Sequence, residues 1–254
     1  MKLAAWNVNS LNVRLPHVIE WLKTHRPDAL CLQELKMEDA KFPMGAFDDI
    51  GYHAVFSGQK TYNGVAIISR ARPEDVRRDI AGYEDHQKRV IAATIDGVRV
   101  VCVYIPNGQT VESEKFQYKL QWLTALQGYM RGTIAEYGDV ALLGDYNIAP
   151  EDRDVHDPKA WKGQVLCTPQ ERSAFGALIG LGLVDSFRLF DQPEKSFSWW
   201  DYRMNGFRRN LGLRIDHILL TANLATRCSA GSIDLEPRKL ERPSDHAPVV
   251  AELR

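Results

Sequence analysis

Residues 90–104 read VIAATIDGVRVVCVY, two apolar runs separated by the dipeptide Asp96-Gly97. An Asp-Gly pair between strand-like runs favours a tight hairpin, so strands over 90–95 and 98–104 are predicted to pair antiparallel. Further apolar runs alternate with helical patterns along the whole chain. The other predicted strands cover residues 3–7, 29–33, 52–56, 65–69, 140–144, 215–221 and 248–253. Because hairpins occur beside helix-linked strands, the sheet is predicted to be mixed.

Three segments carry apolar residues at helical spacing: 16–25, with Pro16 near its first turn, 115–137 and 169–181. Helices interspersed among mixed strands indicate sheets packed together with helices outside, a layered α/β sandwich. No repeat, low-complexity stretch or long linker divides the chain. Residues 1–254 are therefore expected to form a single domain.

The composition excludes disordered and fibrous proteins, because 44% of the 254 residues are hydrophobic and 26% are charged. The 32 basic and 33 acidic side chains leave a net charge of -1, so any contact with nucleic acid must come from a local patch. No signal peptide and no apolar run of about 20 residues is found, which predicts a cytoplasmic protein without membrane contact. The four scattered cysteines are expected to be reduced, buried thiols.

Acidic residues border four of the predicted strands. A single such residue is usually a solvated turn residue, but four of them, with amides and a histidine in similar positions, favour a shared pocket. Anions in a poorly solvated pocket require a cation. Carboxylate and amide oxygens without thiolates suit Mg²⁺, which keeps positions for water and a phosphate. The residues of this predicted phosphoryl site are Asn7, Glu34, Asp145, Asn147, Asp216, Asp245 and His246.

Asp216 and His246 form a second predicted element. A carboxylate bonded to an imidazole sets its tautomer and raises its basicity, so the ring can stay protonated near a phosphate oxygen. The remaining histidines are interpreted as structural or solvated residues, namely His17, His25, His53, His86, His156 and His217.

Eight motifs carry a resemblance to a known family. In chain order they are WNVNSLNVR (6–14), LCLQELK (30–36), YNGVAI (62–67), YIPNG (104–108), GDYNIAP (144–150), FSWWDYR (197–203), GLRIDHIL (212–219) and SDHAPV (244–249). Together they span nearly the whole chain and resemble bacterial exonuclease III, a family of DNA-repair nucleases in the endonuclease/exonuclease/phosphatase superfamily. The resemblance implies a four-layer, DNase I-like α/β sandwich in which two mixed sheets pack face to face with helices outside.

The resemblance also implies roles for the polar residues. Glu34 would be the main ligand of Mg²⁺, with Mn²⁺ as a substitute, and Asn7 and Asp245 would lie beside it. Asp145 would orient and activate water, while Asn147 holds Asp145 or the phosphate. The further implied roles are a phosphate-binding or proton-donating His246 supported by Asp216, a Tyr104 hydroxyl near the scissile phosphate, and Asn107 next to the DNA.

Aromatic and basic residues complete the implied DNA contacts. The residues alone favour a buried tryptophan pair, but the family lines its abasic-sugar pocket with Trp199, Trp200 and Leu213. A group of basic residues near the FSWWDYR motif is predicted to bind the DNA phosphates that flank the site. It comprises Arg203, Arg208, Arg209 and Arg214, with Arg89 and Arg172 as further candidate contacts. Leu166, in a loop that the family places near the pocket, neither clearly opens nor clearly closes it.

The implied activity is cleavage 5′ to abasic sites in duplex DNA and removal of nucleotides or blocking groups from nicks and 3′ ends, leaving a 3′-hydroxyl. A monomer is the default assembly. Three alternatives stay open: a 3′-end-processing enzyme with little abasic-site incision, a phosphatase of inositol phosphates or sphingolipids, and a non-catalytic nucleic-acid-binding regulator.

Overall fold

The two runs of residues 90–104 form β6 (Val90–Ile95) and β7 (Val98–Tyr104), which pair antiparallel around the Asp96-Gly97 turn as predicted. The computed structural model describes residues 1–254. In it β7 also pairs parallel with β8 (Val140–Asp145), so this sheet is mixed. Its order is β5-β6-β7-β8-β12-β9, where β5 is Glu74–Arg78, β12 is Asp216–Thr221 and β9 is Leu183–Asp185.

A second six-stranded sheet has the order β13-β14-β1-β2-β4-β3. Its central strand β1 (Lys2–Asn7) pairs antiparallel with β14 (Val249–Leu253) and parallel with β2 (Ala29–Gln33), so this sheet is also mixed. The remaining members are β13 (Cys228–Ile233), β4 (Val65–Ser69) and β3 (His53–Ser57). A two-stranded ribbon of β10 (Trp199–Trp200) and β11 (Gly212–Leu213) stands apart from both sheets.

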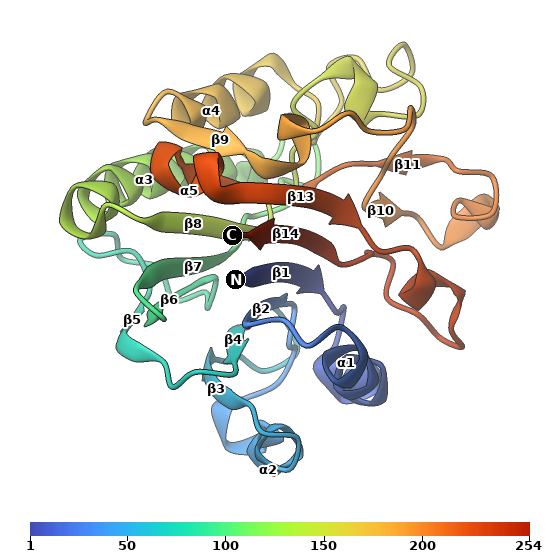
Figure 1. The fold of residues 1–254 in the computed structure, drawn as a ribbon. Helices are drawn as coiled ribbons and strands as arrows, with labels where there is room; N and C mark the ends of the chain where they lie inside the picture. Colours follow the sequence, from blue (N-terminus) through green and yellow to red (C-terminus); the bar gives the residue numbers. More distant parts are fainter.

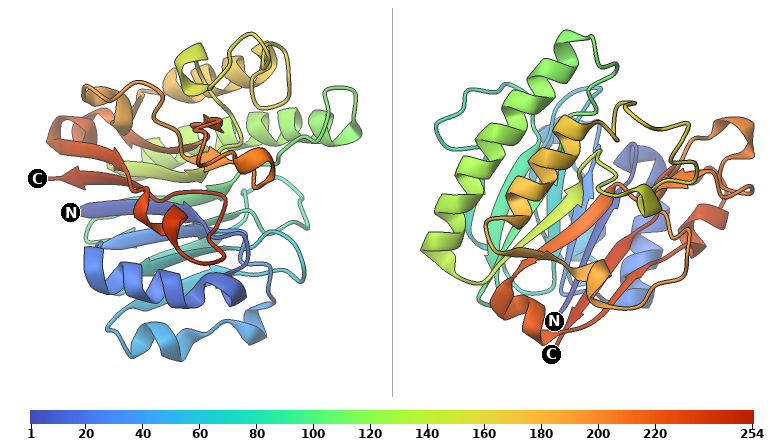
Figure 2. Two further views of the ribbon diagram at one scale, coloured as in Figure 1. Left: turned by 90° about the vertical axis from the view of Figure 1, so that its right-hand side faces the viewer. Right: turned by 90° about the horizontal axis from the view of Figure 1, so that it is seen from above.

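Helices cover the outer faces of the two sheets (Figures 1 and 2). The β1 sheet carries α1 (Leu11–His25) and α2 (Met44–Asp48), whereas the β7 sheet carries α3 (Glu114–Tyr137) and α4 (Pro169–Ile179). The short helix α5 (Ala222–Arg227) connects β12 to β13. Short 3-10 segments lie at Asp39–Lys41, Asp152–Asp154, Ser186–Leu189, Arg203–Asn205 and Glu236–Lys239. The predicted four-layer α/β sandwich is confirmed.

The core between the sheets follows from alternation along each strand. Successive side chains of a strand point to opposite faces, so Leu3 and Ala5 of β1 enter the layer between the sheets, whereas Ala4 and Trp6 pack under α1. The same alternation governs β7, β8 and β12. A polar residue that continues the inner register at a strand end therefore faces the partner sheet.

Two differences from the predicted elements have physical causes. Helix α1 begins at Leu11 rather than at residue 16, because Leu11 is buried together with Val18 and Leu22 at helical spacing, and the exposed Pro16 removes a single backbone hydrogen bond. The strands that were not predicted include β5, β9 and β13, and each forms an edge of its sheet. Edge strands are short or polar, so they lack the apolar pattern of central strands.

No helix of the structure is both long enough and apolar enough to cross a bilayer. The four cysteines are free thiols; Cys31, Cys102 and Cys167 are buried as predicted, whereas Cys228 is only half-buried.

Candidate active site

Three polar side chains stand side by side at the end of the β7 sheet. In the strand register Tyr104 of β7 is the partner of Asp145 of β8, and Asp145 is the partner of Asp216 of β12. All three continue the inner register of their strands, because Cys102, Leu143 and Ile218 two residues away belong to the core between the sheets. The period of the strands therefore aims these groups at the opposite sheet.

Asn7 at the end of β1 links the two sheets. Its Nδ2 donates to Glu34 Oε1 at 2.8 Å and to Asp145 Oδ2 at 2.9 Å. The other Glu34 oxygen, Oε2, lies 2.9 Å from Lys36 Nζ. Glu34 itself directly follows β2 and has a left-handed φ of 54°, a strained conformation for this residue that concentrates at functional sites.

Backbone and side-chain donors surround Asp145. The Asn147 amide N–H donates to Oδ1 at 2.8 Å, and Asn147 Nδ2 lies 3.3 Å from Oδ2. Asn107 Nδ2 in turn donates to Asn147 Oδ1 at 3.0 Å. Gly144 lets β8 approach β7 here, because a Cβ at this residue would lie 1.9 Å from Val103 O. These contacts hold the carboxylate in one orientation.

Asp216 and His246 meet as predicted. His246 Nδ1 lies 2.9 Å from Asp216 Oδ2, and Ser198 Oγ donates to the same oxygen at 2.6 Å. The opposite ring atom, Nε2, lies 3.7 Å from Asp145 Oδ2. Burial alone would lower the pKa of His246, but the Asp216 and Asp145 carboxylates outweigh it and raise the pKa to about 10. The imidazole is therefore a cation at neutral pH.

The pKa values of Asp145 and Tyr104 are shifted toward their neutral forms. Burial, aided by the Asp216 charge, raises the pKa of Asp145 to about 7, although His246 and the hydrogen bonds from Asn7 and Asn147 oppose this shift. Burial and the nearby Glu34 and Asp145 carboxylates raise the pKa of Tyr104 well above its usual range. Asp145 can thus exchange a proton near neutral pH, while Tyr104 keeps its proton.

Glu34, Asp145 and His246 form a group in which one potential ligand atom of each lies within 4.8 Å of the others. Asp245, which was expected beside Glu34, is not in this group. Its Oδ1 accepts from Asn9 Nδ2 at 2.9 Å and its Oδ2 from Trp199 Nε1 at 3.0 Å. Two of the three candidate ligand atoms in this group are carboxylate oxygens and none is a thiolate, which fits a hard divalent cation.

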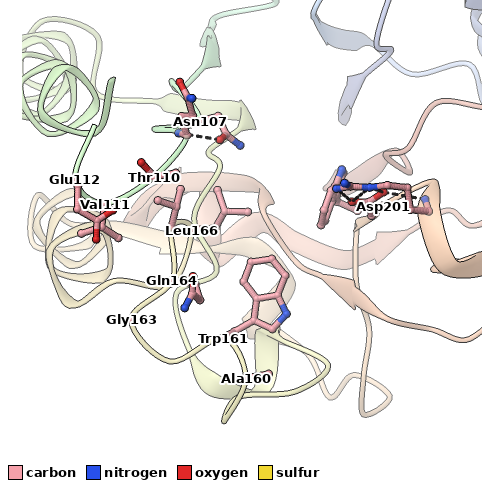
Figure 3. Close-up of a pocket in the computed structure, with 14 residues that line it drawn as sticks. Asn107, Thr110, Val111, Glu112, Ala160, Trp161, Gly163, Gln164, Leu166 and Asp201 are labelled. Carbon is pink, nitrogen blue, oxygen red and sulfur yellow. Dashed lines mark hydrogen bonds and ion pairs between the residues drawn. The ribbon is translucent and has the colours of Figure 1, made fainter. Parts of the chain in front are cut away.

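A pocket of about 730 Å³ adjoins these polar residues. Asn107, Leu166 and Trp199 are among its lining residues, and Figure 3 shows Leu166 between Asn107 and Trp161. Leu166 is only 6% exposed and packs in the same apolar cluster as Trp199. The pocket therefore has an apolar floor. Arg203, in the 3-10 segment Arg203–Asn205, lies on its rim.

Trp200 and Leu213 do not line this pocket, which corrects the expectation for both. Trp200 is 1% exposed and packs with Phe197 and Phe207, because alternation in β10 turns it away from Trp199. Leu213 is fully buried beneath Trp199, its partner in the β10–β11 ribbon. Trp199 and Trp161 are the aromatic residues that line the pocket.

The predicted basic contacts divide into exposed and buried residues. Arg203, Arg208 and Arg209 are exposed on the loop between β10 and β11. Arg214 corrects the expectation: it is 1% exposed and bonds Asp154 at 2.7 Å and Asp185 at 2.8 Å, so it supports the fold.

Arg89 and Arg172 are also engaged within the protein. Arg89 is 8% exposed, and its guanidinium lies 4.8 Å from the centroid of the Tyr104 ring and donates to Tyr104 O at 3.1 Å. Arg89 thus supports Tyr104 and lines a pocket with Tyr104 and Asn107, and its contact with DNA stays a prediction. Arg172 Nε donates to Ala149 O at 3.1 Å, and its Nη1 pairs with Asp152 at 2.7 Å.

Some residues of the site were not predicted. Asn9 and Lys36 are bonded to each other at 2.5 Å and contact Asp245 and Glu34 respectively, and Ser198 holds Asp216. The only sequence feature that could have identified these three residues is that each lies within one of the quoted motifs. The structural interpretation of His217 is confirmed, because the ring is buried between Arg214 and Ile148 O, and burial lowers its pKa to about 4.

Comparison with known proteins matches residues 4–246 to the Endonuclease/Exonuclease/phosphatase family. The chain is 38% identical to exodeoxyribonuclease III of Haemophilus influenzae, with 100% of both chains covered. It is similar to the structure of the 3′ phosphatase NExo from Neisseria bound to a product DNA hairpin, with 50% identity, a TM-score of 0.99, and 100% and 99% of the two chains covered. An AP endonuclease from Archaeoglobus fulgidus has 44% identity and a TM-score of 0.97 over the same shares.

Proposed function

The chain belongs to the Endonuclease/Exonuclease/phosphatase family and is a DNA-repair nuclease of the exodeoxyribonuclease III type, and from this premise we propose its reaction and substrates. The protein is a Mg²⁺-dependent phosphodiesterase that cleaves duplex DNA 5′ to abasic sites and clears nucleotides or blocking groups from 3′ ends, leaving a 3′-hydroxyl. The observation that carries the proposal is the convergence of Asn7, Glu34, Asp145 and His246 beside the pocket walled by Trp199.

Asp145 is the base that orients water and takes its proton. It is buried, and its pKa of about 7 lies near the working pH, where a general base is most effective. Asn7 and Asn147 hold the carboxylate from two sides, so the lone pair that accepts the proton is aimed in one direction. Such positioning by fixed donors lowers the reorganisation that the reaction requires.

His246 supplies positive charge to a phosphate oxygen. Asp216 accepts a hydrogen bond from the Nδ1 N–H, so the Nε2 N–H is available for the phosphate, and the raised pKa keeps both ring nitrogens protonated. Tyr104 keeps its phenolic proton and donates it as a hydrogen bond near the scissile phosphate. Asn107, bonded to Asn147, contacts the DNA at the pocket.

Glu34 and Asn7 would hold the divalent cation, Mg²⁺ or in its place Mn²⁺, and Asp245 would contribute from beside them. When bound, the ion supplies neutralisation of phosphate charge and stabilisation of the leaving oxygen. Lys36 balances the negative charge of Glu34. The assignment is supported by the carboxylate oxygens of Glu34 and Asp145, which lie close together, and by the position of Glu34, which is half-buried beside the buried Asp145.

The pocket and its rim support recognition of damaged duplex DNA. Trp199 offers an apolar wall for a sugar turned out of the helix, and exposed arginines grip the flanking phosphates. We further propose that the chain is one domain, acts as a monomer and works in the cytoplasm, where its four free thiols stay reduced.

A second candidate is a 3′-end-processing enzyme with little abasic-site incision. It is favoured by the 50% identity to a structure described as a 3′ phosphatase. Under this alternative the turn that carries Leu166 admits a 3′ terminus and excludes a sugar within a continuous strand.

One experiment separates the two candidates. Two labelled duplexes, one with an internal abasic-site analogue and one with a nick ending in a 3′-phosphate, are incubated with the protein in Mg²⁺ or EDTA. Cleavage of both in Mg²⁺ alone supports the main proposal, and reaction of the second alone supports the end-processing enzyme. No reaction on either contradicts both. Asp145→Asn is the control and is expected to lose about 10²-fold or more in rate while still binding DNA.

A further inference from the structure

Lys119 of α3 is a fully buried cation outside the group of residues described above. Its Nζ donates to Asn147 O at 2.6 Å, Asn107 O at 3.1 Å and Glu171 Oε1 at 2.5 Å. An ammonium has three N–H donors, so all of its hydrogen-bonding capacity is used. Two of the three acceptors are backbone carbonyls of residues that contact Asp145 directly or through one hydrogen bond.

Glu171 of α4 is fully buried as well, and its carboxylate accepts four hydrogen bonds. Oε1 accepts from Lys119 Nζ and from the Leu166 amide at 3.0 Å, while Oε2 accepts from the Thr168 amide at 3.0 Å and the Thr168 hydroxyl at 2.7 Å. Glu171 therefore does more than cap α4. It also fixes the turn that carries Leu166 into the pocket floor.

Leu166 needs this support because its φ is 78°, in the left-handed region that leucine rarely adopts. The turn is tied back to the polar residues a second time, since the Ala149 amide donates to Leu166 O at 2.8 Å. Three segments distant in sequence thus meet at one ion pair: the loop of Asn107, the loop of Asn147 and the turn of Leu166.

We propose that Lys119 and Glu171 are a positioning pair, which holds the Asn107 and Asn147 loops in register with the pocket floor at Leu166. This inference rests on the proposed function, because Asn147 matters through Asp145 and Leu166 through the pocket. Neither member of the pair touches the reacting atoms. Lys119 acts through Asn147, and Glu171 acts through Leu166.

The test compares three variants: Lys119→Met, the double variant Lys119→Met/Glu171→Gln, and Leu126→Ala on the same helix as the control. Lys119→Met leaves the Glu171 carboxylate buried without its cation, so it is expected to destabilise the fold strongly. The double variant removes both charges and is expected to regain most of that stability. Leu126→Ala destabilises α3 by leaving a cavity in the core and removes none of the hydrogen bonds that Lys119 and Glu171 make.

Steady-state kinetics at 25 °C on the nicked 3′-phosphate duplex distinguishes positioning from folding. The double variant is expected to lose about tenfold or more in kcat with a KM within about threefold of wild type, because Asn147 is displaced while the exposed arginines that contact the DNA backbone are unchanged. Leu126→Ala is expected to keep its kcat. A double variant with regained stability and wild-type kcat would overturn the proposal, as would an equal loss of kcat in Leu126→Ala.

Hydrogen exchange gives a readout that does not need activity. In the double variant the Ala149 and Leu166 amides are expected to exchange about tenfold faster or more, while the amides of β8 keep their protection. Unchanged protection of both amides would overturn the positioning pair. If the wild-type protein cleaves neither duplex, the proposed function fails, and the exchange experiment still decides whether the pair positions these loops.

Discussion

Replacing Asp216 by Asn tests how the site keeps His246 charged. The change keeps the shape of the side chain but removes the negative charge next to His246 Nδ1, which lies 2.9 Å from Asp216 Oδ2. Two unit charges about 4 Å apart at an effective dielectric constant of about 20 interact by about 4 kcal/mol, which corresponds to about 3 pKa units. Removing Asp216 should therefore lower the pKa of His246 from about 10 to about 7.

The sign of the effect on activity follows directly. A protonated His246 is required, so its contribution to wild-type activity is present below pH 10 and is lost as the pH rises through that value, whereas protonation of the base Asp145 lowers activity separately below about pH 7. In Asp216→Asn the loss moves to about pH 7 and leaves about 3% of the ring protonated at pH 8.5, a decrease of about 30-fold in activity relative to wild type at the same pH.

The assay is kcat/KM on the nicked duplex between pH 6 and 9.5, at constant Mg²⁺ concentration and ionic strength. Ser198→Ala is the matched control, because it removes a hydrogen bond to Asp216 Oδ2 and keeps the charge. Its pH profile should shift much less. A ratio of Asp216→Asn to wild-type activity that stays constant across the range would refute the role of His246 as a cation.

Three further predictions concern Arg214 and His217, which are buried, and Arg209, which is exposed. Arg214→Met removes the cation of the buried Asp185 and leaves Asp154 with Arg188 alone, so urea unfolding should show a loss of about 3–5 kcal/mol; a loss below 1 kcal/mol would contradict the buried role. Arg209→Ala, at an exposed position, should leave stability within about 0.5 kcal/mol but lower the slope of log affinity for duplex DNA against log salt by about 1, and an unchanged slope would remove it from the DNA contacts. His217 has a folded-state pKa of about 4, below its unfolded value, so the unfolded state takes up its proton first as the pH falls. The His217 contribution to the free energy of unfolding should therefore decrease by about 2 kcal/mol between pH 7 and pH 5, measured as the difference between wild type and His217→Gln in urea unfolding at the two pH values, and a difference that does not change with pH would contradict this role.

The buried charges share one physical logic. Lys119 with Glu171, and Arg214 with Asp154 and Asp185, are removed from water in pairs whose hydrogen bonds are satisfied. Such pairs add little net stability compared with apolar residues, but breaking one of them is costly. These pairs stabilise only one arrangement of the segments that they join. The loops that carry Asn147 and Leu166 need such a fixed arrangement.

The sequence by itself determined the layered fold and most of the polar site. Central strands such as β7 and β8 are predominantly apolar because both of their faces are covered, so they can be recognised as apolar runs in the sequence. Asp145 and Glu34 stand where such runs end, and chain order with residue type was enough to propose that they meet. The edge strands β5, β9 and β13, which are short or polar, carried no comparable signal, whereas the more apolar edge strand β3 was predicted.

Only the tertiary structure decided which way each side chain points and what it meets. Trp199 and Trp200 are neighbours with the same chemistry, yet the register of a two-residue strand sends one to the pocket and buries the other. Arg209 and Arg214 are both arginines of one basic segment, but burial gives them opposite roles. Lys119 shows the same limit, because its three acceptors come from segments far apart in the chain, and contacts of that kind exist only once the layers have packed.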